Sequence, residues 1–213
     1  MKHLATLAIV TSVCGVAWSV SAQDKDGSYR KGPLIGFAVG AAEKCGGCDA
    51  QSGPAFDWHV GWAVSRRVAL LLDRVLIVTS DDRIYYYEFT ENFTIDTVAA
   101  QYWLTDRVWL RGGAGLATYR MTYHDVRGAS RTVDNGGFGA TATAGVELVR
   151  TRRKGFAMDL QLSFQTSSHA PAAGHADVRF NRLAGQFGFN WYHRHHPHAD
   201  SDAGQRPTDG GQS

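Results

Sequence analysis

The stretch Ala55-Phe-Asp-Trp-His-Val-Gly-Trp-Ala-Val-Ser-Arg66 alternates large apolar residues with small or polar residues. The apolar set consists of Phe56, Trp58, Val60, Trp62 and Val64, and the other set of Asp57, His59, Gly61, Ala63 and Ser65. Because successive side chains point to opposite faces of a strand, the stretch predicts a strand with one apolar face and one small or polar face. The apolar face would be buried in a soluble sandwich, whereas it would face lipid in a membrane-spanning barrel.

The N-terminus predicts export. Met1-Lys2-His3 gives a short positive start, Leu4–Val20 is apolar and uncharged, and Val20-Ser21-Ala22 fits a signal-peptidase site before Gln23. We therefore expect a cleaved signal peptide over residues 1–22 rather than a membrane-spanning helix, which needs about 20 apolar residues.

The composition argues against two further classes. The formal net charge is only +2 and no basic run is long, which argues against nucleic-acid binding. Beyond the signal peptide, no apolar run approaches the roughly 20 residues of a membrane helix. The chain has 24 glycines and 5 prolines, and glycines lie inside apparent strands. In a narrow barrel, small inward residues leave room for large ones.

Eight segments have the two-residue period of a strand, namely residues 33–42, 55–66, 68–79, 93–104, 108–121, 137–149, 156–165 and 177–192. Long connections alternate with short turns, and the long ones are Glu43–Ser52, Ser80–Asn92, His124–Gly136 and Thr166–Ala176. Long loops at one end and short turns at the other are typical of an outer-membrane barrel. The predicted fold is all-β, an eight-stranded antiparallel up-and-down transmembrane β-barrel.

Two of these strands alternate imperfectly. Asp73 and Arg74 are adjacent, so one of them faces the wrong side or a bulge intervenes, and a second bulge is expected because Phe93 and Ile95 are out of phase with Val98. Aromatic residues gather at strand ends, which predicts girdles at the membrane interfaces; they are Tyr85–Tyr87, Tyr102, Trp103, Trp109, Trp191 and Tyr192.

The segment Ala100-Gln-Tyr-Trp-Leu-Thr-Asp-Arg-Val-Trp-Leu-Arg-Gly-Gly-Ala-Gly115 and the closing Gly188-Phe-Asn-Trp-Tyr192 resemble the small OmpA/OmpX-type barrels of Gram-negative bacteria. The assembly signal of that family is matched by Gln186, Gly188 and Trp191, and the sequence departs from it at His193. The resemblance implies an outer-membrane location, contact with outer-membrane lipid and insertion by the barrel-assembly machinery. We expect a monomer that does not bind nucleic acid.

The predicted organisation has four parts. Residues 1–22 form the signal peptide, residues 23–32 a disordered lead-in and residues 33–192 the barrel. Residues 193–213, which hold a cluster of histidines, form a disordered periplasmic tail. Metal binding by these histidines is an alternative to a disordered tail with only incidental weak metal affinity, and no metal site is assigned.

Six ionisable residues share the inward phase of their strands: Asp57, His59, Arg111, Glu147, Asp159 and Arg182. Because side chains fill the lumen of an eight-stranded barrel, buried charges there must pair, and we expect a structural ion-pair network. Arg111 and Glu147 lie on neighbouring strands near short turns, so they are expected to form one pair. The alternative is a gated pore or a proton path.

Two further patterns contain residue types that can carry chemistry. Cys45 and Cys48 lie in a loop of an exported chain, which predicts a disulfide rather than redox or metal chemistry. Ser168 and His169 suggest a lipid A-modifying hydrolase as an alternative, but they do not form the pattern of that family. We expect no catalytic residue and no cofactor, and thus a structural or interaction role. A soluble β-sandwich or lipocalin-like binding protein is the remaining alternative.

Overall fold

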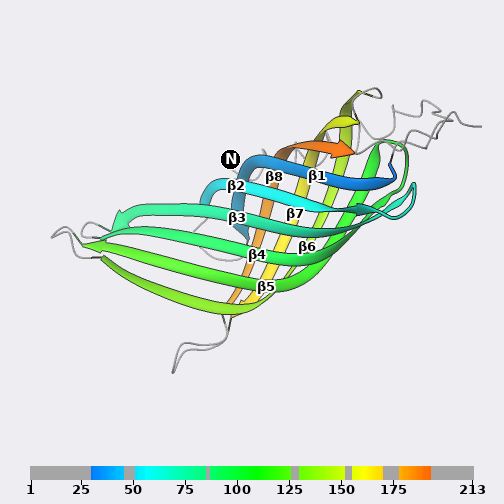
Figure 1. The fold of residues 1–213 in the computed structure, drawn as a ribbon. Coiled ribbons are helices and arrows are strands. Elements are labelled where there is room, and N and C mark those ends of the chain that lie inside the picture. Colours follow the sequence, from blue (N-terminus) through cyan, green and yellow to red (C-terminus); the bar gives the residue numbers. More distant parts are fainter. Residues whose placement is uncertain are drawn as a thin grey trace, which may run out of the picture.

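The computed structural model describes residues 30–45, 51–84, 87–125, 130–151, 155–169 and 178–192. Eight antiparallel strands follow one another around a closed barrel, and β8 returns to pair with β1 (Figure 1). They are β1 (Gly32–Cys45), β2 (Ser52–Ala63), β3 (Val68–Ile84), β4 (Tyr87–Trp103), β5 (Val108–Asp125), β6 (Ser130–Thr151), β7 (Phe156–His169) and β8 (Val178–Tyr192). None of the described residues belongs to a helix that is long and apolar enough to cross a membrane.

The apolar face of the opening stretch lies outside the barrel. Trp58 and Trp62 are 48% and 56% exposed, whereas Asp57 and His59 are buried. The same division holds around the barrel, whose outward residues include Phe37, Leu72, Val98, Leu116, Phe138 and Phe187. The closed ring excludes the sandwich alternative, and the outward apolar face is the reverse of what a soluble lipocalin-like barrel requires.

The two ends of the barrel differ in how far their strands extend. At the turn end, short connections such as residues 64–67 and 104–107 join the strands, and β1 begins and β8 ends there. At the hairpin end, β3 with β4 and β5 with β6 project beyond the other strands (Figure 1). The hairpin end has longer strands in place of the predicted long loops: residues 85–86 and 126–129 connect them there, no more residues than 64–67 and 104–107 at the turn end.

Much of the predicted long loops is strand. Ser80–Asn92 continues β3 and β4, which stay paired as far as Ile84 and Tyr87, so the connection adds length and no extra strand. His124–Gly136 likewise continues β5 and β6, which stay paired as far as His124 and Ser130. In β6, none of residues 130–138 is buried and Gly139 is the first buried residue, so this part of the hairpin lacks the apolar alternation that marks a strand in the sequence.

Of the two alternatives left open at Asp73 and Arg74, the structure has the first, a charged residue on the apolar face, and the bulge expected near Phe93 is absent. β3 and β4 pair without interruption from Val68 to Asp81, and Asp73 points inward while Arg74 points outward. Phe93 and Ile95 point into the lumen in regular phase. The alternation looked broken because the lumen becomes apolar towards the hairpin end. The one register shift between β6 and β7 lies at Glu147 and Val149.

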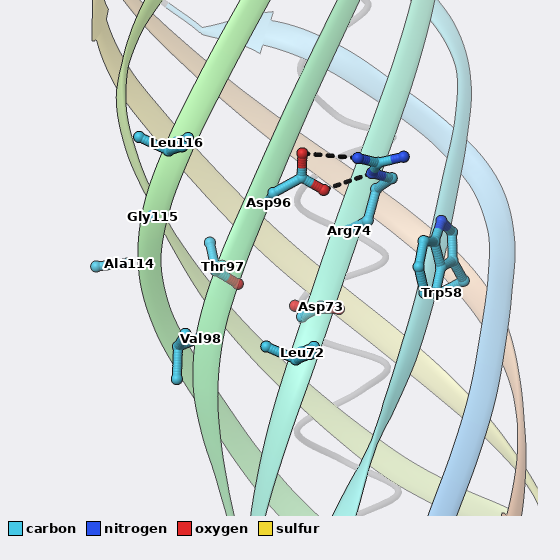
Figure 2. Close-up of a pocket in the computed structure, with 10 residues that line it drawn as sticks. All are labelled: Trp58, Leu72, Asp73, Arg74, Asp96, Thr97, Val98, Ala114, Gly115 and Leu116. Atoms are coloured by element: carbon cyan, nitrogen blue, oxygen red, sulfur yellow. Dashed lines mark hydrogen bonds and ion pairs between the residues drawn. The ribbon is translucent and has the colours of Figure 1, made fainter.

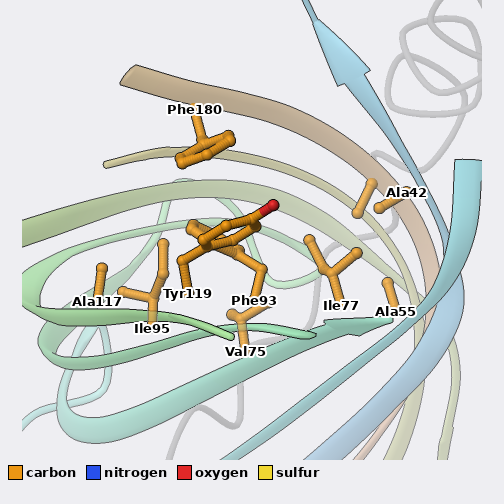
Figure 3. Close-up of a cluster of buried hydrophobic side chains, with 10 residues drawn as sticks. Ala42, Ala55, Val75, Ile77, Phe93, Ile95, Ala117, Tyr119 and Phe180 are labelled. Atoms are coloured by element: carbon orange, nitrogen blue, oxygen red, sulfur yellow. The ribbon is translucent and has the colours of Figure 1, made fainter. Parts of the chain in front are cut away.

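Two apolar clusters fill the lumen on either side of a polar layer. The hairpin-end cluster, drawn in Figure 3, consists of Ala42, Ala55, Val75, Ile77, Phe93, Ile95, Ala117, Tyr119, Phe180 and Ala184. Its rings of Tyr119 and Phe180 stack with centroids 4.7 Å apart. The turn-end cluster consists of Leu34, Ala63, Ala69, Leu71, Ala99, Trp103, Trp109, Ala157 and Tyr192.

The turn-end cluster corrects part of the predicted aromatic girdle. Tyr102 and Trp191 are exposed as expected, but Trp103, Trp109 and Tyr192 are buried in the lumen. Large rings fit there because small residues face them. A Cβ atom on Gly145 would lie only 2.2 Å from Cζ2 of Trp109. These three aromatic side chains therefore close the turn end rather than contact the membrane interface.

Candidate functional site in the barrel lumen

The polar layer is centred on Arg111, which β5 points into the lumen. Nη2 of Arg111 donates to Oδ2 of Asp57 at 2.6 Å, and Nη1 lies 3.5 Å from Oδ1 of Asp73. Both carboxylates come from strands across the lumen, β2 and β3, and all three side chains are at most 1% exposed. The guanidinium thus joins three strands by charge-assisted contacts in a place without water access.

His59 and Asn190 extend this centre towards β8. Nη1 of Arg111 lies 2.7 Å from Nδ1 of His59, and Nε2 of the same ring lies 2.7 Å from Oδ1 of Asn190. An arginine can only donate, so Nδ1 must accept and Nε2 must carry the proton that Asn190 accepts. His59 is therefore assigned as the Nε2–H tautomer by its hydrogen-bond partners.

Asp159 closes the layer on β7. Its Oδ2 accepts from Nδ2 of Asn190 at 2.7 Å, and its Oδ1 accepts from Nε2 of Gln161 at 2.8 Å. Oε1 of Gln161 in turn accepts from Nη2 of Arg111 at 3.3 Å. Arg111, His59, Asn190, Asp159 and Gln161 thus form a continuous ring of hydrogen bonds across the barrel.

Glu147 does not pair with Arg111, which corrects the predicted ion pair. Its carboxylate lies 3.1 Å from Nη2 of Arg30 and 3.7 Å from Nε of Arg150. The register explains the error, because Arg111 on β5 faces Thr143 on β6 and Glu147 lies further along towards the turn end. Sequence phase gives the face of a strand, but the stagger of a barrel sets the depth.

Two aromatic side chains complete the surroundings of Glu147. Nε1 of Trp103 donates to its Oε1 at 3.3 Å, and the Tyr192 hydroxyl donates to the same oxygen at 3.1 Å. The guanidinium carbon of Arg30 lies 4.6 Å from the Trp103 ring centroid. Arg30 is only 3% exposed, so this end of the predicted disordered lead-in is an ordered part of the barrel.

Arg182 lies apart from both groups, near the hairpin end. Nη2 of Arg182 lies 3.4 Å from Oε2 of Glu91, and its guanidinium carbon lies 4.8 Å from the Phe93 ring centroid. The structure therefore places all six predicted residues in the lumen but divides them among three sites. It brings Asp57, His59, Arg111 and Asp159 together, and it leaves Glu147 and Arg182 with other partners.

Sequence reasoning missed several members of these sites. The phase of Asp73 is ambiguous in the sequence because Arg74 follows it, and Glu91 lies in a segment that the sequence predicts as a loop. Arg30 precedes the first strand, where no periodicity could reveal a long-range contact. Asn190 and Gln161 could have been predicted as members of the polar layer, because both are polar residues on the inward face of strands that alternate regularly.

The central layer has the residue types of a metal site but not the space for one. Single ligand atoms of Asp57, His59 and Asp73 lie within 4.8 Å of one another. The Arg111 guanidinium already contacts all three, and its permanent positive charge stands where a metal ion would bind. The two apolar clusters enclose this layer from both ends, so the arrangement favours a structural network over a conducting path.

Other residues of interest are only partly described. Cys45 ends β1 as a free thiol among the described residues, and Cys48 lies outside them, so the disulfide stays a prediction. Ser168 and His169 end β7 rather than lying in a loop; Ser168 is exposed, and the His169 side chain is outside the described part. The signal peptide (residues 1–22) and the tail (residues 193–213) also lie outside the described residues.

Comparison with known proteins gives a match by structure alone. No family model matches the chain, and no curated protein matches its sequence. Ail, the attachment invasion locus protein of Yersinia pestis, solved in complex with the heparin analogue sucrose octasulfate, aligns with a TM-score of 0.53 at 11% identity, over 76% of this chain and 99% of that one. A second structure of Ail aligns with a TM-score of 0.52 at 10% identity over the same shares.

Neisserial surface protein A aligns with a TM-score of 0.49 at 11% identity, over 80% of this chain and 100% of that one. Identities this low speak to the fold and not to ligands or activity. Together with the closed ring of eight strands, the alignment with Ail shows that this chain has the fold of the small eight-stranded outer-membrane β-barrels, the OmpA/OmpX-like class that its sequence resembles.

Proposed function

We propose that this chain is an outer-membrane protein of a Gram-negative bacterium with a structural or interaction role and without catalysis. The observation that carries the proposal is the inverted distribution of polarity, with an apolar belt outside and buried charges inside. Residues such as Leu72, Val98 and Leu116 are 60–68% exposed, which is favourable in lipid and unfavourable in water.

The filled lumen supports a role at the cell surface rather than in transport. Apolar clusters lie at both ends of the polar layer, and the largest inward side chains, Trp103 and Trp109, lie at the turn end. The parts left to act on other molecules are the projecting hairpins of β3–β4 and β5–β6. In this proposal the hairpins face the exterior, the turns face the periplasm, and the cleaved segment 1–22 directs export. Outer-membrane lipid and the barrel-assembly machinery are the proposed partners.

Membrane fractionation combined with heat-modifiability tests this proposal. Expressed with its signal peptide, the chain should lose residues 1–22, sediment with outer membranes and migrate differently on a gel before and after heating. A chain recovered in the soluble periplasm with unchanged migration would contradict the proposal. Mass spectrometry of lipid A from the same cells should show no change, whereas loss of an acyl chain would favour the hydrolase alternative.

A further inference from the structure

An ion pair interrupts the apolar outer face of the barrel. Arg74 on β3 and Asp96 on β4 face each other in register, with side chains 46% and 48% exposed. Nε of Arg74 donates to Oδ1 of Asp96, and Nη2 donates to Oδ2 at 2.9 Å (Figure 2). The pair is thus bidentate and lies outside the barrel, not in the lumen.

The surroundings of this pair are apolar on most sides. Leu72 precedes Arg74 on the outer face of β3, and Leu76 and Val78 follow it towards the hairpin end. Val98 and Leu116 are exposed on the next two strands. If the belt lies in lipid, as proposed above, these charges are within it, where ionisable groups are costly and usually face a protein partner.

Part of the hydrogen-bonding capacity of the pair is unused. Within the described chain, Nη1 of Arg74 makes no hydrogen bond, and each Asp96 oxygen accepts only one. Trp58 lies on the other side of the guanidinium, with its ring centroid 5.6 Å from Cζ. Hydrocarbon chains offer no donors or acceptors. A second copy related by a two-fold axis offers both, because its Asp96 can meet this Arg74 and the reverse.

The shape of the same outer face would allow a second protein surface to approach it closely. A hollow of about 390 Å³ lies beside the ion pair, and Ala114 and Gly115 form its far side (Figure 2). Trp58 and Leu116 rise at its edges as large exposed side chains. In membranes, small residues let two protein surfaces approach closely, and a neighbouring ridge can fill such a hollow.

We propose that the outer face of β3, β4 and β5 is an interface for a second copy of this chain, with Arg74 and Asp96 paired reciprocally across a two-fold axis. This replaces the monomer expected from the sequence. It rests on the proposed membrane location. Each copy presents a donor, an acceptor, a hollow and a ridge, so the surface is complementary to itself.

Mixing two charge-reversal variants tests the interface. Wild-type protein refolded in lipid nanodiscs or mild detergent should sediment as a dimer, whereas Arg74→Asp chains alone and Asp96→Arg chains alone should sediment as monomers. Mixed in equal amounts, the two variants should recover the dimer, because acidic and basic faces then meet. Heat-modifiability of each sample establishes that it is folded; failure of wild type to insert into lipid would instead count against the proposed location.

Two controls isolate the face. Arg120 and Asp134 form a similar exposed bidentate pair on the β5–β6 hairpin, at 54% and 51% exposure, so Arg120→Asp should leave the dimer intact. Ala114→Trp fills the hollow and should yield monomers, whereas Ala41→Trp on the outer face of β1 should not. A wild type that is folded but monomeric in lipid would overturn the inference and leave lipid as the occupant. A dimer that survives Ala114→Trp or both single reversals would place the interface elsewhere.

Discussion

Nη2 of Arg111 lies 2.6 Å from Oδ2 of Asp57, and both side chains are fully shielded from solvent. Asp73 lies 3.5 Å from the same guanidinium, and Asp159 is linked to it through Gln161. A charge in such a place is tolerated only while its partners remain. The stability of the barrel should therefore depend on Arg111 more than on any single one of its carboxylate partners.

A double-mutant cycle on Arg111 and Asp57 measures this dependence. Arg111→Met should lower the free energy of unfolding by about 3–5 kcal/mol, because it leaves buried carboxylates uncompensated. Asp57→Asn should cost less, since Asp73 still contacts the guanidinium. The double variant should recover part of the loss, with a coupling energy of about 0.5–3 kcal/mol in urea unfolding from lipid vesicles.

The matched control for that cycle pairs Arg111→Met with Glu147→Gln. These residues contact different partners, so their effects should add within about 0.5 kcal/mol. Strong coupling here, with additivity at Asp57, would restore the pairing predicted from the sequence and contradict the structure.

Glu147 and Arg30 test whether the segment before β1 belongs to the barrel. Glu147→Gln should cost about 3–5 kcal/mol, because Arg30 and Arg150 lose the carboxylate between them. Arg30→Met should cost about 1.5–3 kcal/mol, because Glu147 keeps its other donors. The same vesicle assay compares them. An Arg30→Met variant as stable as wild type would return residue 30 to the disordered lead-in.

The strand faces could be predicted because lipid outside and packed side chains inside impose a period of two. Arg74 and Phe93 obscured this period in the sequence. Arg74 is a charged residue on the outer face, and Phe93 is an apolar ring in the lumen. Both residues depart from the expectation that polar side chains lie on one face of a strand and apolar side chains on the other. Neither residue requires a bulge, because Arg74 forms an ion pair on the outer face and Phe93 packs in the apolar cluster at the hairpin end of the lumen.

Contacts across the lumen could not be predicted. Glu147 meets Arg30 and Arg182 meets Glu91 across large sequence separations, and the depth of each depends on the stagger of the strands. The hairpins were missed for a different reason. Their strands pair beyond the filled lumen, so neither face carries the apolar alternation that marks a strand in the sequence.

Two outward positions on β2 test the orientation by depth. Val60→Arg places a charge well inside the belt and should cost about 2–4 kcal/mol in lipid vesicles, whereas Trp62→Arg lies nearer the turn end and should cost less. In each case the loss should shrink in short-chain detergent, where the arginine can reach water. Equal costs for both changes in both media would argue that this face does not contact lipid.

Replacing glycine by alanine should have different effects on stability at one turn position and at one strand position. Gly155 has φ +61°, and a Cβ atom there would lie 2.1 Å from the Tyr192 carbonyl oxygen, so Gly155→Ala should cost more than about 1–2 kcal/mol. A Cβ atom on Gly185 in β8 would have no atom within 4 Å, so Gly185→Ala should be neutral or stabilise by about 0.5–1 kcal/mol. Unfolding free energies in one lipid compare the two. Equal losses would contradict the turn geometry at Gly155.

Single-channel recording in planar bilayers tests the central claim, that packed and ion-paired side chains close the lumen. Wild-type protein, inserted and shown to be heat-modifiable, should give no discrete openings. A porin recorded in the same bilayers serves as the control that insertion and recording work, since it conducts ions through an open, water-filled lumen. Stable openings in wild type whose conductance changes in Arg111→Met would contradict the account and identify the charged layer as the wall of a pore.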